Sequence, residues 1–228
     1  PEMLKMLSEI FENCHSHASR FASLADSANH AAEQMAFLSA TFSERSTGYS
    51  LQMEPCFMPV LTKETLQKYV RKDLPGREIF LVQLQDYTRQ LAKQKMIYIC
   101  SMEGILRFLQ NGRIPEIPDG LYEIPSVSDR IQIVKALLAP ERATRLRILK
   151  NSIGNTETPI YLYITPKTGT LRLPLATDQM VNLQIQETGM LEAFYDFCEN
   201  LDEEMFYSFE EAEQIVEEEM KAGDWKTE

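Results

Sequence analysis

The residues that most often carry proton transfer and nucleophilic attack are scarce in this sequence. It has three histidines and four cysteines among 228 residues, and His15, His17 and His30 all lie near the N-terminus. The sequence places no cysteine beside a histidine in a pocket, and it contains no glycine-rich phosphate loop or dinucleotide fingerprint. Acid pairs such as Glu203 and Glu204 lie in a strongly acidic, solvated segment. We therefore expect no catalytic residues, no cofactor, and a protein that is not an enzyme.

Long apolar runs and an export signal are also missing. No stretch approaches the run of about 18 apolar residues that a membrane-spanning helix needs, and no basic region followed by an apolar core opens the chain. The cysteines Cys14, Cys56, Cys100 and Cys198 are far apart in apolar surroundings. That distribution is typical of reduced, buried thiols rather than a disulfide framework. We expect a cytoplasmic protein without a membrane partner.

A metal site is the one chemical possibility that the N-terminal histidines raise. Cys14 and His17 lie about one helical turn apart and could supply two ligands. His15 would point to another face, and His30 lies roughly three and a half turns further along a helix. Because a third ligand is not evident, we interpret these histidines as solvated or packed and expect no bound metal.

Negative charge is concentrated at the C-terminal end. The net charge is -11, and residues 202–228 contain 11 acids against two lysines. Such a segment cannot lie along a phosphate backbone, which requires the opposite sign. The chain starts at Pro1 rather than methionine, so we expect further sequence upstream. If the whole protein contacts DNA, we expect it to do so only through an upstream domain that is absent from this chain.

Residues 3–44 show a seven-residue apolar rhythm that predicts helix. The low helix propensity of residues 26–29 leaves two successive helices open. One interpretation is that the apolar face packs on its own domain, and the other is that it forms a homodimer interface. We predict two regions, a helical connector and dimerisation region over residues 1–50 and a sensor domain with an acidic C-terminal helix over residues 51–228. The two apolar rows are Leu7, Cys14, Phe21, Ala28, Met35, Phe42 and Met3, Ile10, His17, Leu24, Ala31, Leu38.

The remaining sequence alternates between helical and strand patterns, which predicts an α+β (mixed α/β) fold. The helical region ends at Gly48, and an irregular apolar stretch follows over residues 51–61. A mixed sheet of about five strands, flanked by helices, is expected over residues 95–100, 145–150, 160–165, 170–175 and 181–186. Helices are expected from Thr62, from about residue 77, after Ser101, from Ser128 and Asp129, and over residues 190–201 and 209–221.

A binding pocket is the remaining functional feature that the pattern predicts. In open α/β sheets, ligands favour the loops at the C-terminal ends of strands. A proline-rich loop over residues 113–125 is long enough to fold over such a pocket. Ordinary packing or surface charge is the alternative role for each candidate. The candidate effector-pocket residues are Cys100, Ser101, Met102, Arg113, Tyr122, Arg130 and Thr165.

From about Tyr98 onward, the order of features resembles the C-terminal regulatory region of Firmicute helix-turn-helix regulators with an XRE- or Cro-like DNA-binding head. The matching segments are residues 97–112 (IYICSMEGILRFLQNG), 128–131 (SDRI), 161–163 (YLY), 189–197 (GMLEAFYDF) and 207–211 (YSFEE). The order is also distantly similar to a phospholipase-D-like α/β half. Those enzymes carry a His-x-Lys signature, and no histidine lies beyond residue 30, so this resemblance implies a catalytically inactive fold.

The resemblance implies the effector-sensing and dimerisation portion of a bacterial transcriptional regulator. An unidentified small molecule or protein would shift the helices between two arrangements, for which it must have different affinities. Two alternatives stay open. One is an interaction scaffold that uses the acidic C-terminal end, and the other is an enzyme with a site of dispersed acids.

Overall fold

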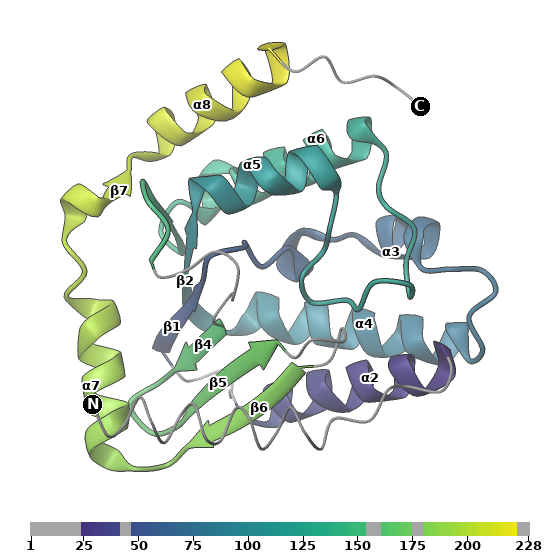
Figure 1. The fold of residues 1–228 in the computed structure, drawn as a ribbon, viewed down its shortest axis with the longest axis horizontal. Helices are drawn as coiled ribbons and strands as arrows, with labels where there is room; N and C mark the ends of the chain where they lie inside the picture. Colours follow the sequence, from purple (N-terminus) through teal and green to yellow (C-terminus); the bar gives the residue numbers. More distant parts are fainter. Residues whose placement is uncertain (1–23, 42–46, 154–160, 175–179, 223–228) are drawn as a thin grey trace.

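The computed structural model describes residues 24–41, 47–153, 161–174 and 180–222. Within these residues, a seven-stranded mixed sheet has helices packed on both faces (Figure 1). The α+β class is therefore confirmed, although the sheet has seven strands rather than about five. No helix in these ranges is long and apolar enough to cross a membrane.

The sheet combines a parallel centre with antiparallel flanks, in the order β6-β5-β4-β1-β2-β3-β7. β1, β2 and β3 are parallel, whereas β4, β5 and β6 form an antiparallel meander that joins β1 through β4. β4 and β5, which correspond to the strands expected over residues 160–165 and 170–175, are joined as a hairpin. The strands are β1 (Thr47–Gln52), β2 (Lys95–Ser101), β3 (Leu146–Leu149), β4 (Tyr161–Ile164), β5 (Gly169–Pro174), β6 (Met180–Ile185) and β7 (Phe206–Tyr207).

Local capping signals set most helix ends where the sequence predicts them. The Thr62 hydroxyl accepts the N–H of Thr65, and the Ser101 hydroxyl accepts the N–H of Gly104. Gly112 ends its helix with a φ of 69°, which glycine adopts without strain. One start differs, because Ser126 rather than Ser128 caps its helix. The helices are α2 (Leu24–Thr41), α3 (Lys63–Tyr69), α4 (Arg77–Lys93), α5 (Met102–Asn111), α6 (Val127–Leu137), α7 (Thr188–Glu199) and α8 (Phe209–Ala222), with short 3-10 turns η1 (Met58–Val60), η2 (Pro140–Arg142) and η3 (Glu203–Met205).

The described part of the N-terminal helical region is α2, which lies beside α4 (Figure 1). It runs without a break through residues 26–29, so the two-helix alternative does not occur at that point. Four members of the two predicted apolar rows lie on α2 and are buried in the core of the same chain, namely Ala28, Ala31, Met35 and Leu38. The first part of both rows, and with it the Cys14 and His17 pair, lies outside the described residues.

β1 is a central strand that the sequence interpretation missed. Residues 51 and 52 were expected to be irregular, and the predicted division at residues 50/51 falls within this strand. A Cβ on Gly48 would lie 2.3 Å from the carbonyl oxygen of Ile164, so only glycine allows β1 and β4 to pair this closely. Five of the six residues of β1 are buried. Residues 49–52 alternate between apolar and polar side chains, as in a half-exposed strand, but the structure buries both sets.

The two faces of the sheet belong to two different core clusters. One cluster packs α7 against Leu51, Ile99 and Leu162. The other packs α2, α4, α5 and α6 against the opposite face, which includes Cys100 and Tyr163. The sheet is thus the middle layer of the fold, and any site on it must lie under one of these helical layers.

Candidate functional site

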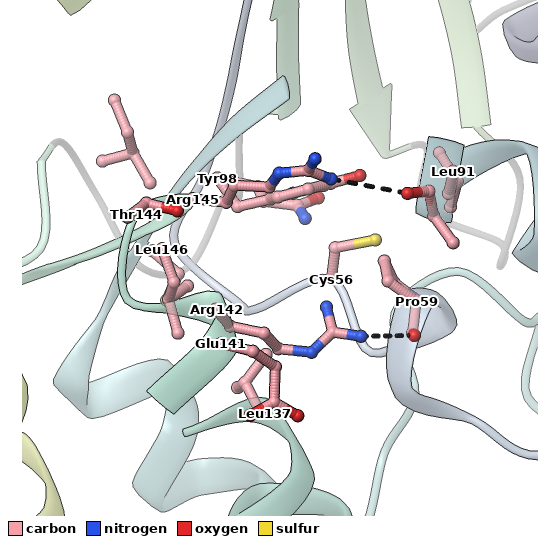
Figure 2. Close-up of a pocket in the computed structure, with 14 residues that line it drawn as sticks. Cys56, Pro59, Leu91, Tyr98, Leu137, Glu141, Arg142, Thr144, Arg145 and Leu146 are labelled. Carbon is pink, nitrogen blue, oxygen red and sulfur yellow. Dashed lines mark hydrogen bonds between the residues drawn. The ribbon is translucent and has the colours of Figure 1, made fainter. Parts of the chain in front are cut away.

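A cavity of about 390 Å³ opens on the α4 side of β2, and we call it the β2 pocket. Its walls come from the C-terminal ends of α4 and α6, from η1 and η2, and from the loop before β3 (Figure 2). Gln52 at the end of β1 and Cys100 near the end of β2 also line it. The pocket therefore reaches the carboxyl ends of two parallel strands, where open α/β sheets commonly bind ligands.

Two guanidinium groups line the pocket and are held by backbone carbonyls. Arg142 Nη2 donates to the Pro59 carbonyl at 2.7 Å, and Arg145 Nη1 donates to the carbonyls of Ala92 and Gln94 at 3.4 and 3.3 Å (Figure 2). Within the described residues, neither arginine forms an ion pair. A guanidinium carries five N–H donors, so both arginines keep donors for a bound molecule.

The inner wall of the pocket carries further polar groups without partners. Gln52 is 2% exposed, and its Oε1 accepts a 3.4 Å hydrogen bond from the Tyr163 hydroxyl. Its Nε2 and the buried hydroxyl of Tyr98 have no hydrogen-bond partner among the described residues. A buried polar group without a partner is costly, so these two groups mark a place where a ligand or water is expected.

These groups belong to two rows of polar side chains that cross the α4-facing side of the sheet, which we call the polar rows. The strand register places Thr170, Tyr163, Ser50 and Tyr98 side by side across four strands. The next row, two residues further along β1, consists of Arg172, Tyr161 and Gln52. Five atoms in the rows have no partner within the described residues, namely Ser50 Oγ, Gln52 Nε2, Tyr98 Oη, Thr170 Oγ1 and Arg172 Nε.

Glu116 brings a buried carboxyl to the same layer from the loop between α5 and α6. It is 8% exposed, and neither carboxyl oxygen has a donor in hydrogen-bond geometry among the described residues. Burial raises the pKa of Glu116 to about 7, against the lowering influence of the Cys56 thiol and the Arg172 guanidinium. Because Cys56 itself lines the β2 pocket, Glu116 lies directly behind the pocket wall.

The pocket thiols are poorly suited to nucleophilic attack. Burial raises the pKa of Cys100 to about 12. Burial, followed by the nearby Glu116, raises the pKa of Cys56 well above its usual value. Since the thiolate is the nucleophile, both cysteines are protonated near neutral pH. Cys56, Cys100 and Cys198 are free and buried, as the sequence predicts.

Of the seven predicted pocket residues, only Cys100 lines the β2 pocket. The Ser101 hydroxyl donates to the Met53 carbonyl at 2.9 Å and caps α5. Met102 is buried in the core. The Thr165 hydroxyl orders the turn between β4 and β5 by donating to the Thr168 carbonyl at 3.0 Å. These three residues are therefore structural, although they follow strand ends.

The remaining predicted residues stabilise the loop that follows α5. Arg113 forms a 2.9 Å ion pair with Asp119 at the surface. The Tyr122 hydroxyl accepts the N–H of Ile114 at 2.6 Å. Arg130 donates to the carbonyls of Leu109, Gln110 and Pro125, which caps the C-terminal end of α5. The loop does not cover the β2 pocket with these side chains, and its contribution is Glu116.

Three residues at the site were not predicted from the sequence. The prediction considered only residues near the C-terminal ends of strands, and these three lie elsewhere. Arg142 and Arg145 line the pocket but precede β3 instead of following a strand. Glu116 lies behind the pocket wall and comes from the loop between α5 and α6. The available signal was the charged segment over residues 141–145, directly before a strand of the parallel group. Among the described residues, no group of three His, Cys, Asp or Glu side chains could hold a metal ion.

No protein-family model matches this chain, and no curated protein or solved structure matches it significantly. The resemblance to helix-turn-helix regulators therefore stays a prediction, and the functional argument depends on the geometry of the β2 pocket.

Proposed function

We propose that this chain is the effector-sensing and self-association portion of a bacterial transcriptional regulator, in which DNA is contacted by a separate upstream domain. The β2 pocket is the effector site in this proposal. The observation that carries it is the pair Arg142 and Arg145, whose guanidiniums line the pocket and are bound only to backbone carbonyls of the described chain. Such groups can exchange a carbonyl for a ligand at little cost.

The position of Arg145 offers a route from the pocket to the N-terminal helical region. Its guanidinium binds the carbonyls of Ala92 and Gln94 at the C-terminal end of α4. A cation at this end of a helix is stabilised by the helix dipole and by the free carbonyls. A ligand that draws Arg145 into the pocket would loosen this end of α4. Because α2 packs on α4, the change would reach the helices proposed to mediate self-association.

The protonated state of the pocket thiols supports sensing over turnover. The raised pKa values of Cys56 and Cys100 leave no thiolate near neutral pH. Of the other groups that line the pocket, the Glu141 carboxyl is exposed, and the amide, hydroxyl and guanidinium groups bind and orient a molecule but are weak acids and bases at that pH. An effector would have to bind the two helix arrangements with different affinity, since equal affinity shifts nothing.

A variant that fills the pocket tests this proposal. Ala92 lines the pocket and is exposed, so Ala92→Trp should block the pocket without disturbing the core. Ala222→Trp, at the exposed end of α8, is the matched control. A collection of sugars, amino acids, nucleosides, amines and carboxylates would be added to the full chain in thermal denaturation. Compounds that bind would then be tested by analytical ultracentrifugation and by hydrogen exchange of α2.

We expect at least one compound to raise the Tm of the wild type and of Ala222→Trp, but not of Ala92→Trp. The same compound should change amide exchange in α2 and the monomer–dimer balance. The proposal is overturned if no compound binds, if binding leaves α2 and self-association unchanged, or if the compound is chemically converted.

A further inference from the structure

We propose that the β2 pocket takes a small organic anion and that the anion binds together with a proton on Glu116. This inference deepens the proposed function, because it names the ligand class and the regulation of the same site. It makes the sensor responsive to two signals at once, the concentration of the anion and the pH.

The ligand class follows from the excess of donors over acceptors in the pocket. Arg142 and Arg145 are permanently charged donors with N–H groups to spare. Deeper inside, the Nε2 of Gln52 and the hydroxyl of Tyr98 are buried donors without an acceptor among the described residues. Among the described residues, Glu141 is the one acidic residue that lines the pocket, and its side chain is exposed. A ligand with several acceptor oxygens would satisfy all four donors.

The walls between these donors suit the carbon skeleton of a small acid. Leu91, Leu137 and Leu146 lie around the cavity together with the ring of Pro59 (Figure 2). A volume of about 390 Å³ admits a molecule the size of a short-chain or aromatic carboxylate. In the view of Figure 2, the two guanidiniums lie on either side of Cys56, so an anionic group held by them would lie near this thiol.

The proton follows from the position of Glu116 behind Cys56. The charge of Glu116 is destabilised already, because burial outweighs the Cys56 thiol, the neighbouring backbone N–H groups and Arg172, which all favour it. An anion bound on the other side of Cys56 in a low dielectric would raise the cost of that charge further. Glu116 therefore has to be neutral when the anion is bound. The carboxyl would take up a proton wherever it was ionised before binding.

No other group that faces Glu116 changes its charge near neutral pH. The pKa of Cys56 is raised well above its usual value, and that of Tyr122 is raised to about 12. Burial also raises the pKa of each remaining phenol, while Arg172 stays cationic. The groups coupled to Glu116 are Cys56, Tyr87 from α4, Tyr98 from β2, Tyr161 and Tyr163 from β4, Arg172 from β5 and Tyr122 from its own loop.

Isothermal titration of the full chain with paired acids and amides tests the ligand class. The probes are acetate, succinate, hexanoate, adipate and benzoate, each compared with its neutral amide. We expect at least one carboxylate to bind, its amide to bind at least tenfold more weakly, and Arg145→Gln to weaken the carboxylate by about tenfold, the loss of one charge-assisted contact. The proposal that the ligand is an anion is wrong if the amides bind as tightly as the acids, or if all five carboxylates fail to bind.

The pH dependence of the same titration tests the proton. Above pH 7 the dissociation constant of the wild type should rise up to about tenfold per pH unit, since a proton must be added to the complex. Glu116→Gln should bind with a constant that no longer depends on pH, whereas Glu123→Gln, an exposed carboxyl in the same loop, should behave as the wild type. Titrations of the wild type in two buffers of different ionisation enthalpy count the proton without any variant. If ligand binding at pH 8 is not accompanied by proton uptake, the proposed protonation of Glu116 is wrong.

Failure of this inference can be told apart from failure of the proposed function. A neutral compound that changes α2 exchange and is blocked by Ala92→Trp would preserve the sensor and refute the anion. A carboxylate that binds with proton uptake but leaves α2 unchanged would preserve the anion and refute the sensor.

Discussion

The two faces of the sheet are built from the same strands but from different side chains. On the α7 side, Tyr49, Leu51 and Ile99 belong to an apolar cluster. On the α4 side, their neighbours in the chain include Ser50, Gln52 and Tyr98, each with a polar atom that has no partner among the described residues. Both faces are covered by helices, so both groups of side chains are removed from water.

This difference separates the part of the sheet that stabilises the fold from the part available for binding. Apolar burial on the α7 side contributes roughly 25 cal/mol for each Å² removed from water. A buried hydroxyl or amide without a hydrogen-bond partner gives no such stabilisation and lowers the free energy of unfolding. The polar rows are thus retained at the expense of stability, and a binding role explains them. The largest expected effects therefore come from the α7 face and the smallest from the polar rows.

The apolar face should be the more sensitive to truncation. Ile164 is fully buried on the α7 side of β4, so Ile164→Ala should lower the free energy of unfolding by about 2–5 kcal/mol through lost transfer energy and a cavity. Urea denaturation measures this loss. Ile79→Ala is the control, since Ile79 is 69% exposed on α4 and should change stability by less than about 0.5 kcal/mol. If the two variants lost the same free energy of unfolding, the apolar face would not be the part of the sheet that stabilises the fold.

The polar face should give the protein a pH-dependent stability that the apolar face cannot. The folded-state pKa of Glu116 is about 7, raised from 4.5. Between these values the folded state holds a proton that the unfolded state has lost, so stability falls as pH rises from about 4.5 to about 7 and is then constant. The total fall attributable to Glu116 is on the order of 3 kcal/mol.

Urea denaturation at pH 5, 6, 7 and 8 checks this dependence. In Glu116→Gln, most of this decrease in stability with rising pH should disappear, whereas Glu123→Gln should show the same decrease as the wild type. A wild type and a Glu116→Gln variant with parallel stability curves would show that the carboxyl is solvated in solution.

The smallest effect is expected within the polar rows themselves. Thr170→Val keeps the shape and removes a buried hydroxyl without a partner, so stability should be unchanged or higher by up to about 1 kcal/mol. Thr165→Val is the matched comparison, because that hydroxyl accepts the N–H groups of Lys167 and Thr168 and donates to a carbonyl. It should cost about 1–2 kcal/mol. A similar cost for both variants in thermal denaturation would mean that an ordered water satisfies Thr170.

Features with a local physical cause were predictable from the sequence. Thr62 and Ser101 fix helix starts through hydrogen bonds to N–H groups three residues further along the chain, and both predictions are confirmed. The five predicted strands are also present. β1 was missed because its local signal is short, an alternation of apolar and polar residues over positions 49–52 only. Its central place depends on the pairing of Ser50 with Tyr98 and Tyr163, both distant in the sequence.

The candidate site was far less predictable, for the same reason. Cys100 was found because the strand-end rule depends only on the order of elements. The guanidiniums of Arg142 and Arg145 become pocket groups only when η2 lies against η1 and the loop before β3 lies against the end of α4. Glu116 becomes buried only when its loop closes against Cys56 and Phe57. The charged segment over residues 141–145 is the only signal near the two arginines, and the sequence around Glu116 does not show that its side chain is buried.

The central place of β1 has a consequence for how the chain is made. This strand is synthesised before both strands that flank it, and β4 follows much later than β2. Until β4 emerges, the backbone groups along one edge of β1 stay unpaired. The apolar side chains that later pack against α7 also stay exposed. Nascent chains that stop before residue 161 should therefore need a chaperone or aggregate, and the sheet should close only after β4 has been synthesised.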